Sequence, residues 1–198
     1  LDMWLLDATN AELRMNSSDL SGALPNAISA LSSLRVLVLG SNALTGSLPA
    51  SWSSLTNLAT LDLNINQLSG TLPPSWSAMT SLEVLAMRDN SFTGAWPAAY
   101  AGMTSLKTID LRNNNLSGVE TGSLAIASLT TVLFFGNGSG FDVDGVVDEI
   151  YANELAGVYT ASSGKSLNIA GSNPAVSAGS ATKITDLEDN YGWTITNN

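Results

Sequence analysis

The chain contains neither cysteine nor histidine in its 198 residues. Without cysteine, disulfide bonds cannot stabilise the fold. Without histidine, neither an imidazole base nor a histidine-ligated metal site can form. The sequence also holds no Ser-His or Cys-His arrangement and no phosphate-binding loop. These absences exclude the commonest catalytic machinery, and we expect a protein that is not an enzyme and that needs no cofactor.

Positive charge is scarce and long apolar runs are lacking. Seven Lys and Arg stand against 17 Asp and Glu, which gives a formal net charge of −10 and a pI near 4.1. Nucleic-acid binding requires clustered basic side chains, so nucleic acid is excluded as a partner. Ser, Asn and Gly interrupt every apolar run well before the roughly 20 residues that span a bilayer, so we expect no membrane insertion.

The most regular feature of the chain is a 24-residue period. The pattern L-x-x-L-x-L-x-x-N-x-L occupies residues 34–44, 58–68, 82–92 and 106–116, with Asn42, Asn66, Asn90 and Asn114 in register. Leu37 and Leu39 fall on one face of a pleated strand, and Val36 and Val38 fall on the other. The period predicts one short strand per repeat, stacked on the strand of the next repeat.

Asn42, Asn66 and Asn90 are each followed by an L-x-G-x-L-P step or a close variant, at residues 44–49, 68–73 and 92–97. Residues 20–25 repeat the step in a degenerate first unit. These letters resemble the plant-type subclass of leucine-rich-repeat proteins. The resemblance implies an α/β solenoid: an arc with a parallel sheet on its concave face. Residues 72–82 are also similar to repeats of kinetoplastid surface antigens. In this family the asparagine amides bond to backbone groups of neighbouring repeats, so the four asparagines are expected to form a structural ladder.

An aromatic column runs through the same period at Trp4, Trp52, Trp76 and Tyr100. Stacking on a sugar is one possible role for such a column. We favour a structural role, because this position is an apolar anchor of the convex segment in the subclass.

The repeat pattern fades after Gly118, and residues 130–135 are interpreted as a final strand. Beyond it, apolar spacing predicts a helix over 144–158, a strand over 166–170, a second helix over 180–190 and a last strand over 193–196. We predict leucine-rich repeats over 1–138 and a capping segment over 139–198 that continues the solenoid. The tail resembles those that follow such repeats in bacterial and phage proteins.

A cluster of acids lies at the start of the first predicted helix. Asp142, Asp144 and Asp148 are a candidate calcium site, because Gly145 fits the sixth position of an EF-hand loop. The first and twelfth positions would then be Gly140 and Tyr151, which cannot supply the required carboxylates. Capping of the helix explains the same residues, and we favour it.

The concave face is the best candidate for a binding surface. Its outward positions form columns: Glu12, Val36, Thr60, Val84, Thr108 and Val132; then Arg14, Val38, Asp62, Ala86, Asp110 and Phe134; then Asn16, Gly40, Asn64, Arg88 and Arg112. From these columns we predict partner-binding residues: Arg14, Val38, Asp62, Asn64, Arg88, Asp110, Arg112 and Phe134. The alternative is a solvated sheet whose charges pair along neighbouring strands.

The favoured function is a recognition or adhesion module, extracellular or displayed on a cell or virion surface, that binds a protein or glycan on the concave face. The alternative is a structural or decoration subunit of a virion, filament or surface assembly, for which self-assembly is expected. The chain begins at Leu1 without a signal-like segment, so we expect a processed product or a piece of a longer protein.

Overall fold

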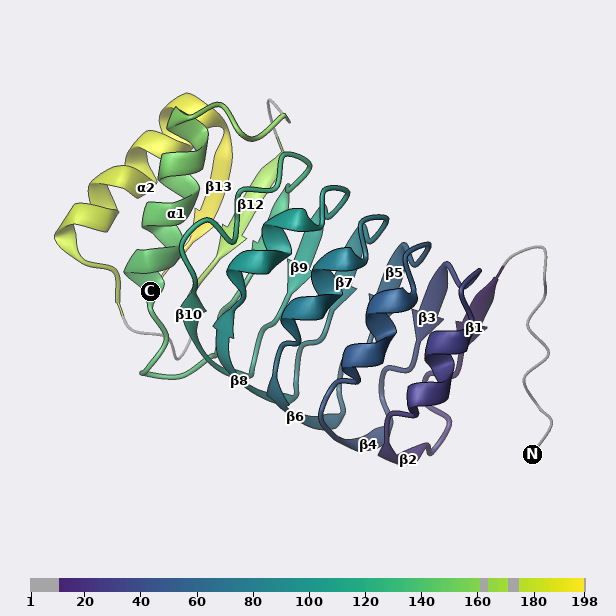
Figure 1. Ribbon diagram of the computed structural model, residues 1–198. Helices are drawn as coiled ribbons and strands as arrows, with labels where there is room; N and C mark the ends of the chain where they lie inside the picture. The colour runs from purple at the N-terminus through teal and green to yellow at the C-terminus, as the bar shows by residue number, and fades with distance from the viewer. Residues whose placement is uncertain (1–10, 161–163, 171–174, 198) are drawn as a thin grey trace.

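The computed structural model describes residues 11–160, 164–170 and 175–197. Figure 1 shows an arc with a long parallel sheet along one face and short helices along the other. The predicted leucine-rich-repeat solenoid is therefore confirmed as the fold. The eight-stranded sheet runs β1 (Glu12–Arg14), β3 (Val36–Val38), β5 (Thr60–Asp62), β7 (Val84–Ala86), β9 (Thr108–Asp110), β11 (Thr131–Leu133), β12 (Lys165–Asn168) and β13 (Trp193–Thr196).

A second parallel sheet and a row of 3₁₀ helices close the remaining sides of the solenoid (Figure 1). The sheet contains β2 (Ser21–Ala23), β4 (Ala43–Gly46), β6 (Gln67–Thr71), β8 (Ser91–Trp96) and β10 (Asn115–Val119). The 3₁₀ helices are η1 (Asn26–Ala30), η2 (Ala50–Ser54), η3 (Pro74–Ala78) and η4 (Ala98–Gly102). Each 3₁₀ helix follows the proline of its repeat, whose ring fixes φ at the residue just before the helix begins.

The aromatic column is part of the core. Trp52 and Trp76 have no exposed surface, and their rings stack with centroids 6.2 Å apart. The Trp76 indole N–H donates to the Pro49 carbonyl of the preceding repeat at 2.9 Å, and the Tyr100 hydroxyl donates to Pro73 in the same way. The structural interpretation of these side chains is thus confirmed, whereas Trp4 lies outside the described residues.

The asparagine ladder forms as predicted. The side-chain amide of Asn90 donates to the carbonyls of Leu63, Met87 and Arg88 at 3.0–3.1 Å. Its side-chain oxygen accepts the Leu68 N–H at 3.0 Å. One side chain therefore forms hydrogen bonds with backbone groups of two repeats, in a turn where those groups cannot bond within a regular sheet.

The ladder has a further rung that the sequence pattern missed. Asn137 follows Asn114 by 23 positions instead of 24, is 4% exposed, and accepts the Leu116 N–H at 3.0 Å. Its amide donates to the Leu111 carbonyl at 3.1 Å. The fifth repeat is thus one residue shorter than the others.

This shortening makes the predicted register of the last repeat strand wrong. Val132 pairs with Ile109 and not with Thr108, so it points into the core. Phe134 is likewise buried, with no exposed surface. Because successive strand residues alternate between faces, an error of one residue moves every side chain to the other face.

The C-terminal segment begins with helix α1 (Val143–Leu155), which starts and ends earlier than predicted. Asp142 accepts the Gly145 N–H at 2.9 Å, which confirms the capping interpretation of this acidic residue. Helix α2 (Ala178–Tyr191) extends beyond its predicted range at both ends and stops at Gly192, whose φ is +69°.

Strands β12 and β13 continue the eight-stranded sheet, while α1 and α2 lie over its end (Figure 1). The division into repeats over 1–138 and a capping segment over 139–198 remains a prediction. A buried polar cluster holds this part together. The Lys165 ammonium pairs with the Glu154 carboxylate, both side chains being almost fully buried, and the Trp193 indole N–H donates to the same carboxylate at 2.5 Å.

Replacing Asn90 or Asn137 with Ala should lower the free energy of unfolding by about 2–4 kcal/mol, because several backbone groups lose their partners. Urea denaturation measures the change. Asn115→Ala is the control: this exposed side chain should contribute less than about 0.5 kcal/mol. A small effect at Asn137 would contradict its place in the ladder.

The Asp144 carboxylate should make stability depend on pH. A hydrogen bond from the Ser177 backbone N–H, 2.9 Å long, lowers the pKa of Asp144. A depressed pKa stabilises the fold above the unfolded value of about 3.9, and this stabilisation disappears as pH falls through the folded pKa. Asp144→Asn should therefore reduce the thermal midpoint at pH 7 and leave it nearly unchanged at pH 2. Equal losses at both pH values would contradict this linkage.

Candidate binding face

The register of the sheet places one outward residue of each strand in a straight column across the concave face. The pairs Val38 to Asp62, Asp62 to Ala86 and Ala86 to Asp110 define the column that holds most of the predicted site residues. Leu133 continues it, where the sequence pattern had placed Phe134. Polar side chains of the central repeats therefore lie close together on an open parallel sheet.

Arg112 and Asp110 form a closed ion pair within one repeat. The guanidinium donates to both carboxylate oxygens, at 2.7 and 2.6 Å, and this bond raises the pKa of Arg112. The same guanidinium lies 5.3 Å from the centre of the Phe135 ring. The Asp110 side chain is only 11% exposed. Arg112 and Asp110 therefore neutralise each other within one repeat. The alternative of charges that pair between neighbouring strands does not apply to these two residues.

Arg88 and Asp62 are held much less firmly. The closest acidic group to Arg88 is Asp89, at 3.6 Å, and the Arg88 side chain is 37% exposed. Asp62 accepts the Asn64 N–H at 2.9 Å but forms no ion pair with any described residue. A Cβ on Gly40 would lie 3.0 Å from a carboxylate oxygen of Asp62, so this glycine leaves room for the acid. The two charges lie on adjacent repeats and remain available to a ligand.

The other predicted site residues differ in what they can contribute. Arg14 pairs with Glu12 at 2.8 Å at the first strand of the sheet. Val38 points outward but is 9% exposed, which leaves it little contact surface. The Asn64 side chain accepts the Arg88 N–H at 2.8 Å and so positions the loop that carries Arg88. Phe134 is part of the core, and its assignment to this face is wrong for the reason of register given above.

Two residues at the edge of this face were missed by the sequence pattern. Phe135 takes the outward place next to Arg112, which follows from the 23-residue spacing of the last repeat. Ile65 is 44% exposed in the turn that follows β5. The sequence does mark Ile65: it stands directly before a ladder asparagine, where the other ladder repeats have Ser41, Asp89, Asn113 and Gly136.

Besides the concave face, the structure has a hollow beside the first residues of strands β3, β5 and β7. It has a volume of about 470 Å³ and is lined by Arg35, Ala59 and Glu83 together with serine hydroxyls. Ala59 is the small residue between two long charged side chains. Glu83 is neutralised by Lys107 at 2.8 Å, so Arg35 carries the net charge of the hollow.

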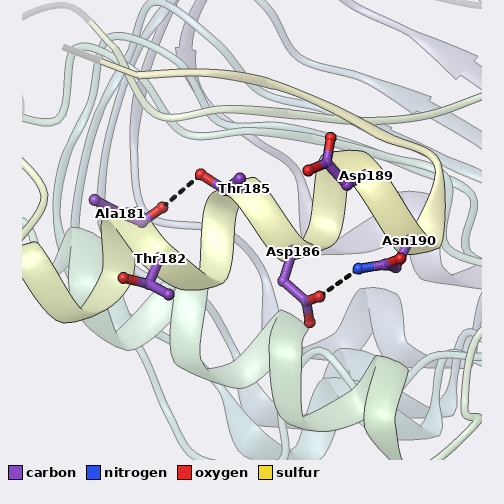
Figure 2. A pocket seen from close by; sticks show the side chains of 6 residues that line it. All are labelled: Ala181, Thr182, Thr185, Asp186, Asp189 and Asn190. Atoms are coloured by element: carbon purple, nitrogen blue, oxygen red, sulfur yellow. Dashed lines mark hydrogen bonds between the residues drawn. The ribbon is translucent and has the colours of Figure 1, made fainter.

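The C-terminal helices carry a third surface. A shallow hollow of about 480 Å³ runs along α2. Figure 2 shows the side chains that line it, among them the carboxylates of Asp186 and Asp189. The Asn190 amide donates to Asp186 at 2.6 Å, and the Thr185 hydroxyl donates to the Ala181 carbonyl at 3.2 Å. These polar groups satisfy one another within the helix.

The three calcium candidates do not converge on one point. Asp142 caps α1, Asp144 accepts from the Ser177 N–H, and Asp148 pairs with Lys183 at 2.6 Å. Within the described ranges, no group of three or more acidic side chains is arranged to hold a metal ion. In the same ranges, the helices are too short or too polar to cross a bilayer.

The two arginines should respond differently to mutation. Arg112→Ala should cost about 1–3 kcal/mol of stability, because the nearly buried Asp110 carboxylate loses both hydrogen bonds from the guanidinium. Arg88→Ala should cost less than about 0.5 kcal/mol, because this exposed side chain has only one long contact. Urea denaturation of both variants tests the contrast. Equal losses would contradict the distinction between a closed pair and an available charge.

Comparison with protein-family models gives two matches, both described as leucine-rich repeat, over residues 11–68 and 105–125. No curated protein matches the sequence. Among solved structures, the chain is similar to the BIR2 ectodomain from Arabidopsis thaliana, with 31% identity over 54% of this chain and 57% of that one, and a TM-score of 0.52.

Two further structures from the same plant are similar. One is the leucine-rich-repeat ectodomain of the receptor kinase SOBIR1, with 28% identity over 63% of this chain and 69% of that one, at a TM-score of 0.58. The other is the receptor kinase HAESA, solved with the peptide hormone IDA and the co-receptor SERK1, with 27% identity over 64% of this chain and 22% of that one, at a TM-score of 0.61.

The chain thus spans just over half of the BIR2 structure and about a fifth of the HAESA structure. The repeat motif, the stacked parallel sheet and the two family matches agree with one another. By repeat motif and by fold, the chain is built as a leucine-rich-repeat solenoid.

Proposed function

We propose that this chain is a non-enzymatic recognition module that binds a protein partner along the concave sheet. The observation that carries the proposal is the pair of available charges, Asp62 and Arg88, on adjacent repeats of an open face. Asp62 forms no ion pair with any described residue, and Arg88 has only a long contact of 3.6 Å to Asp89, so a complementary charge can reach both groups at little cost. The closed pair of Asp110 and Arg112 beside them supplies a rigid border.

A protein suits this face better than a glycan. Flat sugar rings bind best where aromatic rings are exposed, and every described aromatic side chain is buried or half-buried. Trp52, Trp76 and Trp96 have no exposed surface at all, and Phe135 is half-buried beneath Arg112. Hydrogen bonds and charge pairs are therefore the available contacts, and these are typical of protein interfaces.

An extracellular or surface-displayed location, and membership of the plant-type subclass, belong to the same proposal. Similarity to receptor ectodomains supports both, and the HAESA structure contains a peptide hormone and a co-receptor bound to that protein. For the present chain the partner would be a peptide or protein. The bacterial or phage character of the tail and the similarity to kinetoplastid antigens remain predictions.

The module should be a monomer in solution. Light scattering coupled to size exclusion should give about the chain mass of 20.5 kDa over a wide range of concentrations. A net charge of −10 favours this outcome, because copies repel one another. Ordered growth into larger species with concentration would instead favour the alternative of a structural subunit.

The binding face can be tested with peptides selected from a random display library against the wild-type protein. Asp62→Asn and Arg88→Ala should each weaken the selected peptides about tenfold, which corresponds to about 1.4 kcal/mol. Isothermal titration measures the affinity. Gln67→Ala, at an exposed position on the second sheet, is the matched control and should have no effect. Unchanged affinity in both concave variants would place the site elsewhere.

A further inference from the structure

One position in each central repeat adopts a left-handed backbone conformation directly before the ladder asparagine. The φ values are 56° at Ser41, 54° at Ile65, 55° at Asp89 and 53° at Asn113. Asn and Asp tolerate this conformation best among residues other than glycine, whereas a β-branched residue there is a genuine outlier. Ile65 therefore carries a conformational cost that the Asp and Asn of the equivalent turns reduce.

Ile65 carries a second cost, because it is exposed. It is one of two large apolar side chains that are exposed among the described residues, at 44%, and the other is Leu155 at the end of α1. Leu155 lies in a helix and has no unusual backbone conformation. An unfavourable conformation and an exposed apolar side chain thus coincide at one residue. Strained residues of this kind cluster at sites that contact ligands.

The surroundings of Ile65 place it inside the proposed binding face. Its backbone N–H donates to the Arg88 carbonyl at 2.9 Å, so the two residues are direct neighbours across adjacent repeats. Asp62 is three positions earlier, at the end of β5, and its carboxylate is bound to the backbone of Asn64. The backbone of Ile65 therefore lies beside the positions that carry two oppositely charged groups: Asp62, which forms no ion pair with any described residue, and Arg88, whose acidic contact to Asp89 is long at 3.6 Å.

We infer that Ile65 is the apolar anchor of the partner contact, and that the occupant is an extended segment of another protein. The segment would place an apolar side chain on Ile65, a basic group toward Asp62 and a carboxylate toward Arg88. Charge complementarity carries the choice of occupant. A second copy of this chain is disfavoured, because each copy has a net charge of −10. The inference rests on the proposed function and adds the apolar centre of the contact.

Interfaces of this type have a recognisable division of roles. A few desolvated side chains supply most of the binding energy, and polar groups around them fix orientation and exclude wrong partners. Here Ile65 would be the desolvated centre, while Asp62 and Arg88 would set the direction of the bound segment. A peptide bound in this way should contain an apolar residue between an acidic and a basic residue.

The test replaces Ile65 with Asn, the residue that Asn113 already places in the same conformation. Affinity for the peptides selected from the random library should fall about tenfold or more, as measured by titration. The thermal midpoint should stay within about 3 °C, because relief of the left-handed strain offsets the lost partial burial. Ile65→Ser, which introduces the residue type found in the equivalent turn at Ser41, is a second variant with the same expectation.

Two controls match the two features of Ile65. Ser41→Asn makes a change in the equivalent turn of the preceding repeat, and Leu155→Asn removes the other exposed apolar side chain. Both should leave peptide affinity unchanged. A loss in Leu155→Asn equal to the loss in Ile65→Asn would show general adhesion to apolar surface and would overturn the inference.

The remaining outcomes separate this inference from the proposed function. If Asp62→Asn and Arg88→Ala weaken the peptides while both Ile65 variants bind as tightly as the wild type, the proposed function stands and the anchor role is wrong. If none of these variants changes affinity, both are wrong. Unfolding of both Ile65 variants would show a purely structural role and would overturn the anchor. A library that yields no peptide binding above background would overturn the peptide as occupant.

Discussion

The side-chain amide of the ladder asparagine is the interaction on which the rest of the solenoid depends. Each repeat must turn sharply after its strand, and the backbone groups in that turn cannot reach a partner within a regular sheet. Asn66 shows the solution: its amide donates to the carbonyls of Leu39, Leu63 and Asn64, and its oxygen accepts the Leu44 N–H. Stacking therefore satisfies the backbone and buries the apolar core in one step.

The ladder also explains the character of the binding face. The residue before each ladder asparagine is held in a left-handed conformation, in the turn that follows the strand of its repeat. Because the ladder supplies the hydrogen bonds that every repeat shares, the outward side chains can differ between repeats. The chain uses this freedom in two ways. Asp110 and Arg112 form a closed pair, while Asp62 and Arg88 remain available.

The C-terminal segment is stabilised by different chemistry. Its strands β12 and β13 extend the sheet, but its core contains an ion pair between Glu154 and Lys165 with the Trp193 indole bound to the same carboxylate. The Lys165 ammonium also lies 5.9 Å from the centre of the Tyr159 ring. Buried charges of this kind stabilise a fold only when each has its partner, so they require a well-defined arrangement of α1, β12 and β13.

The period, the ladder and the repeat architecture were determined by the sequence, because each depends on local letters at a fixed spacing. Helix ends were predicted to within three residues, since Asp142 and Gly192 are local signals for start and stop. Only the tertiary structure decided the register of β11, where one missing residue turned Phe134 inward. It alone also decided that Arg112 is held by Asp110 while Arg88 is available, and that Ile65 is exposed. The Asp110–Arg112 pair joins residues two positions apart, but its burial and the exposure of Ile65 depend on packing against neighbouring repeats, which a repeat pattern aligns but does not specify.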